Sequence, residues 1–216
     1  MIVTLDGPAG AGKSSAARAL AARLGWWYMD TGAMYRAVAL AALERGVPLA
    51  DGDRLAALAE SLEIAFTDGR VVVDGRDVSA EIRSAHVTSA TRPVADEPRV
   101  REAMKHLQRR LAAGRDVVTE GRDQGSEVFP DAELKVFLTA CPEERARRRH
   151  REEVNRGGVV SLADVLAAQN RRDDGDRGRP VGAMRPAADA VLLDTDGLLP
   201  AEVVDRLVTL VAERRL

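Results

Sequence analysis

Short apolar runs alternate with segments of helical spacing along most of the chain. Residues 2–6 (IVTLD) are apolar and end at Gly7-Pro8, which is typical of a strand buried in a parallel sheet. Residues 14–24 have the composition and spacing of a helix, and Gly25 is suited to end it. The same patterns predict strands over residues 26–29, 116–119, 134–139 and 190–194, and helices over residues 33–45, 51–62, 98–113, 142–157, 161–173 and 200–214. Five short strands interleaved with helices predict an α/β fold, a five-stranded parallel sheet flanked by helices.

The pattern changes after residue 62. The segments 63–67 and 70–73 are rich in β-forming residues and flank Asp68-Gly69, and a second Asp-Gly pair follows at Asp74-Gly75. An Asp-Gly pair between two such segments is a strong hairpin signal. We expect a single domain over residues 1–216 with an antiparallel lobe inserted over residues 63–105.

A glycine-rich segment joins the first strand to the first helix. Residues 7–14 (GPAGAGKS) match G-x-x-x-x-G-K-[ST] in its required context, with a strand before it and a helix after it. Glycines let such a loop curl so that backbone N–H groups point at phosphate oxygens, next to the positive end of a helix. Lys13 is placed to reach the β and γ phosphates of ATP, and the Ser14 hydroxyl to contact Mg²⁺. The predicted ATP-binding residues are Gly7, Pro8, Ala9, Gly10, Ala11, Gly12, Lys13, Ser14 and Ser15.

A phosphate loop alone does not name a reaction, because GTPases, motors and small-molecule kinases all carry one. The chain has no N-K-x-D sequence to read guanine. Polar residues follow two more of the predicted strands, as DTGAMYR at residues 30–36 and EGRD at residues 120–123. Helix capping explains Asp30 or Thr31 but not Tyr35-Arg36. Glu120 can hold Mg²⁺ through water, although an ordinary polar turn is the alternative for this segment.

Several motifs together resemble one family. GPAGAGKSS, DTGAMYRA, PRVRE, EGRDQG, VFPDAELKVFL, RRDDGDRGR and AADAVLLDT occur in the order and spacing of the bacterial cytidylate kinases. The resemblance covers nearly the whole chain. It implies the P-loop nucleoside-monophosphate kinase fold, an acceptor-binding lobe and a short lid, here over residues 157–182. It also implies Mg²⁺-dependent transfer of the γ-phosphoryl group of ATP to CMP or dCMP.

The resemblance assigns roles to individual residues. It places Arg36, Arg122 and Arg179 on the CMP phosphate, and Arg101 and Asp123 on the cytosine edge. Thr31 matches a residue near the base, and Tyr35 belongs to the same CMP-binding set. Arg172 and Asp176 match contacts of the ribose and the lid. Together these give a catalytic set of Lys13, Arg122, Arg172 and Arg179, and a CMP-binding set of Thr31, Tyr35, Arg36, Arg101, Arg122, Asp123, Arg172, Asp176 and Arg179.

The chemistry agrees with these assignments. A guanidinium can donate to O2 and N3 of cytosine, and a carboxylate can accept from its amino group.

Two residues depart from the family pattern, Arg92 where serine is frequent and Glu127 where an apolar residue is frequent. The basic run at residues 145–150 has glutamates on both sides, which favours ion pairs within one helix.

The charged stretch at residues 170–180 (NRRDDGDRGRP) has two interpretations. Mixed charge runs usually lie on solvated surface. Four arginines in eleven residues would nevertheless repel one another unless anions meet them. We therefore predict a lid that closes over both nucleotides, with Arg172 and Arg179 on phosphates and Asp176 on the ribose or on a neighbouring arginine.

The composition of the chain limits its expected partners and location but does not indicate a reaction. The formal net charge of -2 gives no reason to expect nucleic acid as a partner, and no apolar run approaches the ~20 residues of a membrane span. The single cysteine, Cys141, excludes an internal disulfide and is expected to be buried. A cytoplasmic monomer is expected, with ATP, CMP and dCMP as its partners and no membrane contact. The alternatives are a kinase for UMP or a hydroxyl compound such as shikimate, and a non-kinase switch that senses ATP.

Overall fold

The structure is a computed structural model that describes residues 1–67, 69–155 and 157–215. The chain divides into two compact units. The first unit joins Met1–Tyr28 to Gly114–Leu216, and the second is Met29–Ala113. The second unit is therefore wider than the inserted segment 63–105 expected from the sequence.

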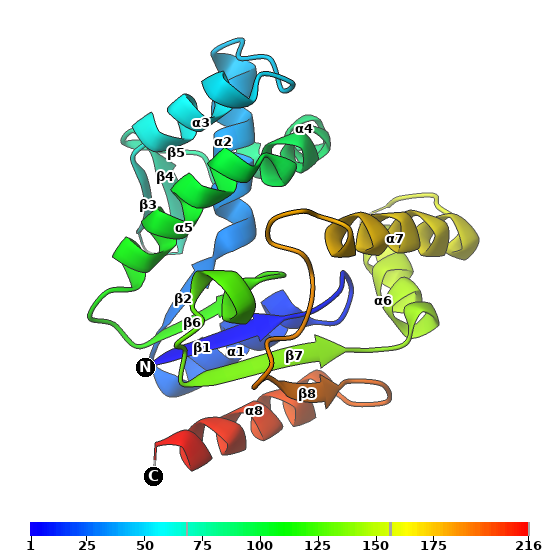
Figure 1. Ribbon diagram of the computed structural model, residues 1–216. Coiled ribbons are helices and arrows are strands. Elements are labelled where there is room, and N and C mark those ends of the chain that lie inside the picture. Colours follow the sequence, from blue (N-terminus) through cyan, green and yellow to red (C-terminus); the bar gives the residue numbers. More distant parts are fainter. Residues whose placement is uncertain (68, 156, 216) are drawn as a thin grey trace. The chain divides into compact units, whose positions relative to one another are not determined.

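The larger sheet has five strands in the order β2-β6-β1-β7-β8 (Figure 1). The strands are β1 (Ile2–Asp6), β2 (Trp27–Asp30), β6 (Val117–Glu120), β7 (Leu134–Thr139) and β8 (Val191–Asp194). Strand β1 pairs in parallel with both β6 and β7, and β7 pairs in parallel with β8. The predicted five-stranded parallel sheet is confirmed, and β1 lies at its centre.

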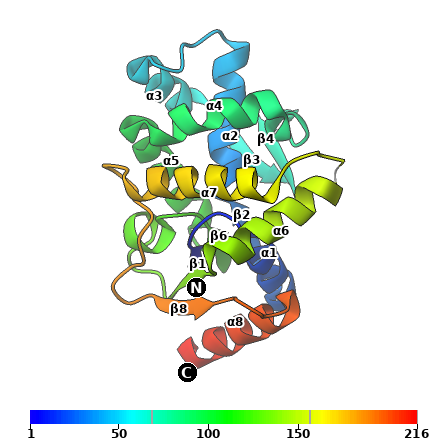
Figure 2. The same ribbon diagram turned by 90° about the vertical axis from the view of Figure 1, so that its right-hand side faces the viewer.

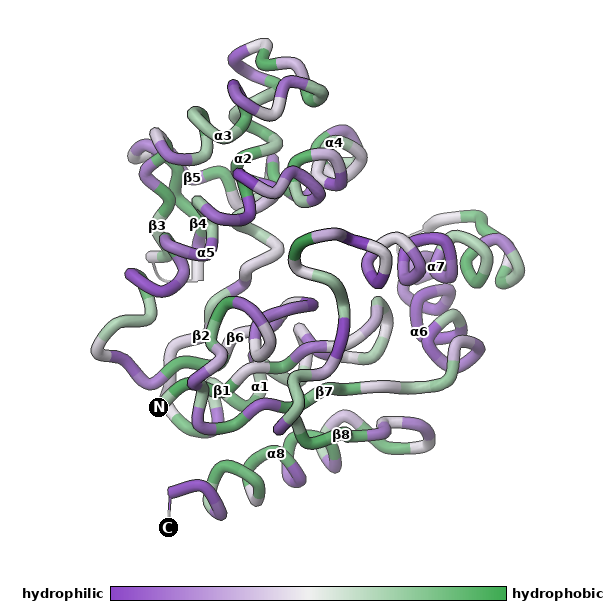
Figure 3. Tube along the Cα trace, in the orientation of Figure 1, coloured by the Kyte–Doolittle hydropathy of each residue, from purple (hydrophilic) through white to green (hydrophobic). Residues whose placement is uncertain are grey.

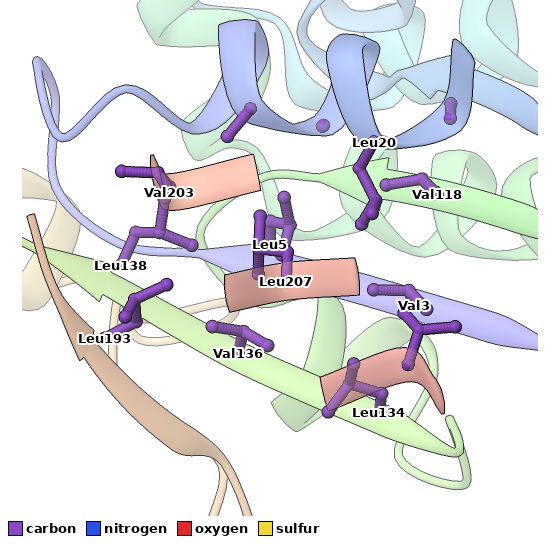
Figure 4. Close-up of a cluster of buried hydrophobic side chains, with 14 of the residues drawn as sticks. Val3, Leu5, Leu20, Val118, Leu134, Val136, Leu138, Leu193, Val203 and Leu207 are labelled. Carbon is purple, nitrogen blue, oxygen red and sulfur yellow. The ribbon is translucent and has the colours of Figure 1, made fainter. Parts of the chain in front are cut away.

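The two faces of β1 differ in chemistry because successive side chains point to opposite sides of a strand. Val3 and Leu5 join an apolar core with Leu20 of α1 (Lys13–Leu24) and Leu207 of α8 (Pro200–Arg214) (Figure 4). Figure 3 shows the contrast between this apolar part of the unit and the mainly hydrophilic α6. Thr4 and Asp6 alternate with the core residues and are also buried. Two buried polar side chains on a central strand indicate that the second face is used for something other than packing.

Two further helices belong to the first unit. Helix α6 (Pro142–Asn155) and helix α7 (Leu162–Arg177) pack against each other, as Figure 2 shows. The sequence predicted that the second of these would end at residue 173, but α7 continues through the RDDGDR segment to Arg177. Gly175 lies within the helix, where it is tolerated at a cost of about 1 kcal/mol relative to alanine. The reason for the extension is tertiary: the buried residues of α7 are Gln169, Asp173 and Asp176.

The second unit surrounds α2 (Thr31–Glu44), which is apolar on most of its circumference, as expected for a helix in the centre of a packed unit. A three-stranded antiparallel sheet has the order β3-β4-β5. The first turn of this sheet was predicted at Asp68-Gly69, and Asp68 lies outside the described residues. The remaining elements are α3 (Gly52–Ser61), β3 (Ile64–Thr67), β4 (Arg70–Val73), β5 (Arg76–Asp77), the 3-10 helix η1 (Glu81–Arg83), α4 (Ala85–Asp96) and α5 (Pro98–Ala112). Helix α2 packs on α4, and α3 packs on α5, which explains why this unit is wider than the inserted segment.

Two local findings complete the fold. Cys141 is exposed, so the prediction that it is buried was wrong. It lies beyond the end of β7, and its N–H donates to the Asp196 carboxylate at 3.0 and 3.1 Å. In the part of the chain that the structure describes, no helix combines the length and the apolar character that a membrane span requires.

Candidate active site

The phosphate loop connects β1 to α1 through a backbone that needs glycine. Gly7, Gly10 and Gly12 have φ angles of 138°, 79° and 88°, which residues other than glycine rarely adopt. A Cβ on Gly7 would lie 2.0 Å from the Leu138 carbonyl oxygen of β7. The start of the loop therefore lies in close contact with β7, and this contact requires glycine at the first position of the motif.

Lys13 and Ser14 begin α1, where the helix dipole favours an anion. The Lys13 ammonium donates to the Pro8 carbonyl oxygen over 2.8 Å, and Lys13 is only 6% exposed. Burial lowers the pKa of Lys13 to about 7, and the neighbouring Arg122 charge acts in the same direction. The Ser14 hydroxyl donates to the Glu120 carboxylate over 2.9 Å, so the two predicted metal-side residues lie together.

This lysine predicts a pH effect on ATP binding. A polyphosphate stabilises the protonated ammonium, so it raises the pKa of Lys13 above about 7. The complex then holds more protons than the free protein at alkaline pH, and ATP affinity falls as pH rises above 7. Calorimetry in buffers of different ionisation enthalpy should show uptake of close to one proton at about pH 8, and Lys13→Met should remove it. Equal proton uptake by the variant would assign the effect to another group.

Arg122, Asp176 and Arg179 form one ion-pair cluster. The Asp176 carboxylate accepts from Arg122 Nε over 2.8 Å and pairs with Arg179 Nη2 at 2.8 Å. Burial alone would raise the pKa of Asp176, but the charges of Arg122 and Arg179 outweigh it and the pKa is lowered. The carboxylate therefore stays ionised and holds both guanidinium groups. Of the two roles predicted for Asp176, the structure shows the contact with neighbouring arginines.

The turn that carries Arg122 and Asp123 is fixed from β1. Asp6 Oδ1 accepts from the Gln124 N–H over 2.9 Å, and Asp6 Oδ2 accepts from the Gly125 N–H over 2.7 Å. Burial raises the pKa of Asp6 to about 7, although both N–H donors act in the opposite direction. Thr119 of β6 donates to the Gln124 side chain over 2.9 Å. The polar face of the central strands therefore supports the short π-helix η2 (Gln124–Val128), which follows Asp123.

Asp6 was missed by the sequence analysis. One signal was available, because a carboxylate at the end of an otherwise apolar strand has no packing role. Its partners could not be found from local pattern, since Gln124 is 118 residues away.

Four of the predicted CMP-binding residues lie in the second unit. Thr31, Tyr35 and Arg36 are on α2, and Asp30 caps the helix by accepting from Ala33 N–H over 3.0 Å. Arg101 of α5 is 6% exposed, donates to the Ala95 carbonyl oxygen over 3.0 Å and lies 5.5 Å from the Tyr35 ring centroid. Thr31 is therefore not the N-cap, and Arg101 and Tyr35 form a cation–π pair. The other predicted site residues belong to the first unit, and of these Arg172 is exposed on α7.

The two departures from the family pattern have surface partners. Arg92 pairs with Asp96 one helical turn later on α4, at 3.4 Å. Glu127 pairs with Arg185 at 3.5 Å. In the basic run of α6, Arg147, Arg148 and Arg149 form ion pairs with glutamates of the same helix, as predicted. Arg145 of this run behaves differently, because it is buried and pairs with Asp173.

The oxygen atoms of Ser14 and Glu120 have the chemistry that Mg²⁺ prefers. Among the described residues, no group of three or more His, Cys, Asp or Glu side chains could hold a metal by itself. Magnesium bound with a nucleotide usually takes only one or two ligands from the protein and the rest from water and phosphate oxygens.

Comparisons with known proteins agree with the geometry. Residues 3–213 match the family described as cytidylate kinase. A cytidylate kinase from Rhodopirellula baltica is 53% identical over 213 residues, which are 99% of this chain and 93% of that protein. A cytidylate kinase from Desulfitobacterium hafniense is 47% identical, over 96% of this chain and 91% of that protein. A bifunctional pantoate ligase/cytidylate kinase from a Synechococcus species is 47% identical over 97% of this chain, but over only 40% of its own length.

Solved structures show the same fold at low sequence identity. A gluconokinase from Sinorhizobium meliloti has a TM-score of 0.50 at 19% identity, with 98% of this chain and 91% of that chain covered. A shikimate kinase from Acinetobacter baumannii in complex with shikimate also has a TM-score of 0.50, at 16% identity, with 100% and 94% covered. At these identities the likenesses show the α/β fold alone. The match over residues 3–213 and the identities near 50% decide the family: the chain belongs to the cytidylate kinases.

Proposed function

We propose that this protein transfers the γ-phosphoryl group of ATP to CMP or dCMP and releases ADP with CDP or dCDP. The observation that carries the proposal is the set of cationic groups beside the phosphate loop, namely Lys13 at the loop itself and Arg122 with Arg179 on the Asp176 carboxylate. Relatives named cytidylate kinase, matched over nearly the whole chain, support CMP as the acceptor.

The reaction needs positioning more than proton transfer. The phosphate of CMP is already an anionic nucleophile, so no strong general base is required. Negative charge on the transferred group and on the leaving group must instead be balanced by fixed cations. Lys13 would act on the donor phosphates, and Arg122, Arg179 and Arg172 on the transferring group and the acceptor phosphate. The family resemblance assigns Arg36 to the acceptor phosphate as well.

Ser14, with Glu120 acting through water, would hold Mg²⁺. The ion supplies further charge neutralisation on the phosphate oxygens of ATP. The hydrogen bond between Ser14 and Glu120 supports this assignment, because it brings a hydroxyl and a carboxylate to one place beside the loop.

The acceptor assay separates the alternatives. ADP release is measured with CMP, dCMP, UMP, AMP, GMP and shikimate, each with ATP and Mg²⁺. The proposal expects the highest kcat/KM for CMP or dCMP, and little ADP without an acceptor. Preference for UMP or shikimate would indicate a different kinase, and equal release without any acceptor would indicate an ATPase or a switch. A monomer and a cytoplasmic location remain predictions.

Asp123 is proposed to read the amino group of cytosine, with Arg101 and Thr31 near the same base and Tyr35 packed against Arg101. Asp123 is buried and follows Arg122 directly, in the turn held by Asp6. Uracil would place a carbonyl oxygen against the carboxylate and leave buried acceptors unpaired, a mismatch that costs about 1–3 kcal/mol.

Replacing Asp123 tests this assignment. Asp123→Asn should reduce the CMP-over-UMP ratio of kcat/KM by about tenfold or more, mainly by weakening CMP. Steady-state kinetics with both acceptors measures the ratio, and the exposed Asp131→Asn is a suitable control. An unchanged ratio in Asp123→Asn would mean that another residue reads the base.

A further inference from the structure

The face that α7 buries is polar. A helix on the surface of a protein normally buries an apolar stripe. Helix α7 instead buries Gln169, Asp173 and Asp176, which recur at the four- and three-residue spacing of one helical face. Each of the three has a defined polar partner, so α7 is held in the first unit by hydrogen bonds and ion pairs on this face.

Asp173 makes the contact with the phosphate loop. It is 1% exposed. Its Oδ1 accepts from the Ala9 N–H over 3.2 Å, and its Oδ2 accepts from Arg145 Nη1. A carboxylate buried this deeply is retained only where it is paired and hydrogen-bonded, and both conditions hold here.

Arg145 completes the connection. Its Nη1 also donates to the Ala9 carbonyl oxygen over 2.9 Å, and its Nε donates to the Ala140 carbonyl oxygen after β7 over 3.0 Å. Both backbone polar groups of Ala9 are therefore bound by the Arg145–Asp173 pair. A Cβ on Gly10 would approach Arg145 to 3.0 Å and the Gln169 amide oxygen to 3.3 Å, so the loop packs directly against α6 and α7.

Asp173 also lies among the residues proposed to act on the phosphates. Arg172 precedes it, Asp176 follows one turn later on the same helical face, and Arg179 is paired with Asp176. The phosphate loop positions the proposed donor, ATP. Helix α7 and the residues directly after it position Arg172 and Arg179. A misplacement of about 1 Å between such groups can cost about 100-fold in rate.

We propose that Asp173 is a positioning residue, whose carboxylate, held between the Ala9 N–H and the Arg145 guanidinium, fixes the arginines of α7 relative to the phosphate loop. The role in catalysis rests on the proposed function. The mechanical part does not, because it states only that the loop and α7 move as one body, so that the α7 part of the lid predicted from the sequence does not move separately from the loop.

The chain provides its own control in the next residue. Asp174 is exposed, with 75% of its side-chain surface accessible, and pairs with Arg177 on the same helix. We expect Asp173→Asn to lower kcat by about 10- to 100-fold with a much smaller change in the KM for ATP. Asp174→Asn should match the wild type in both constants.

A double variant separates positioning from folding. Asp173→Asn leaves the buried Arg145 charge without its partner and can reduce stability for that reason alone. Arg145→Gln with Asp173→Asn removes both charges, and replacing a whole buried pair is often neutral for stability. We expect the double variant to melt near the wild-type temperature while kcat stays low. Recovery of kcat together with the melting temperature would overturn the proposal.

Hydrogen exchange gives a readout that needs no acceptor. In the ATP-bound protein, Asp173→Asn and the double variant should speed exchange both in residues 8–13 and in residues 165–177, whereas Asp174→Asn should not. Faster exchange confined to α7, with the loop as protected as in the wild type, would show that Asp173 does not connect them. This experiment tests the connection between the loop and α7 even if CMP proves to be the wrong acceptor, because no acceptor is present.

Discussion

Lys13→Met is expected to lower kcat by about 100- to 1,000-fold, the range seen when one charge-stabilising donor of a transition state is removed. Methionine has nearly the length of lysine without the ammonium. Lys13 begins α1 directly after the glycine turn, and its Nζ already lies within the loop at the Pro8 carbonyl oxygen. No other lysine or arginine lies in the loop itself, so nothing else in that segment can replace the charge.

Stability should respond differently from activity. Burial disfavours the charged form of Lys13, as its lowered pKa shows, so an uncharged side chain of similar shape removes a cost of folding. The melting temperature of Lys13→Met should equal or exceed that of the wild type. Lys105→Met, which removes an ammonium paired with Glu102 on α5, serves as the control and should retain wild-type kcat. A strongly lowered melting temperature would make Lys13 a structural residue rather than a catalytic one.

Arg179→Ala is expected to lower kcat by at least ~100-fold, because the residue is proposed to neutralise charge on the transferring phosphoryl group. Its side chain is 10% exposed and pairs with Asp176, which also holds Arg122. The loss therefore removes one cation and also changes the charge balance around the second. ATP binding should weaken far less than kcat, since the loop remains intact.

Arg177→Ala is the matched control for this prediction. Arg177 lies two residues earlier, is 55% exposed in its side chain and pairs with the exposed Asp174. Steady-state kinetics with CMP should leave its kcat close to that of the wild type. Equal losses in the two variants would indicate that the net charge of the segment matters, and a near-normal kcat in Arg179→Ala would remove Arg179 from the catalytic set.

The sheet and the phosphate loop could be predicted because their signals are local. The apolar run IVTLD followed by glycine and proline is enough to predict β1, and the motif GPAGAGKS is enough to predict the loop that follows it. Helix α4 was not predicted, since it contains Pro93 together with serine and threonine, which lower helix propensity. Its stability comes from packing on α2, which no local pattern reveals.

The polar support of the site could not be predicted for a related reason. Asp6 binds backbone groups near residue 124, and Asp173 binds Ala9 and Arg145. In the sequence, Arg145 is one arginine in a basic run and Asp173 one aspartate of an adjacent pair. Only the fold shows which of the two aspartates is buried, and the extension of α7 through this charged segment follows from that burial.

The most direct test of the central claim follows the transferred group. Protein is incubated with ATP labelled in its γ-phosphoryl group, Mg²⁺ and CMP, and the labelled products are separated. The account predicts that the label appears in the β-phosphoryl group of CDP, in equal amount to the ADP formed, and that Lys13→Met slows this transfer by about 100- to 1,000-fold. Label recovered as inorganic phosphate, with CMP unchanged, would contradict it.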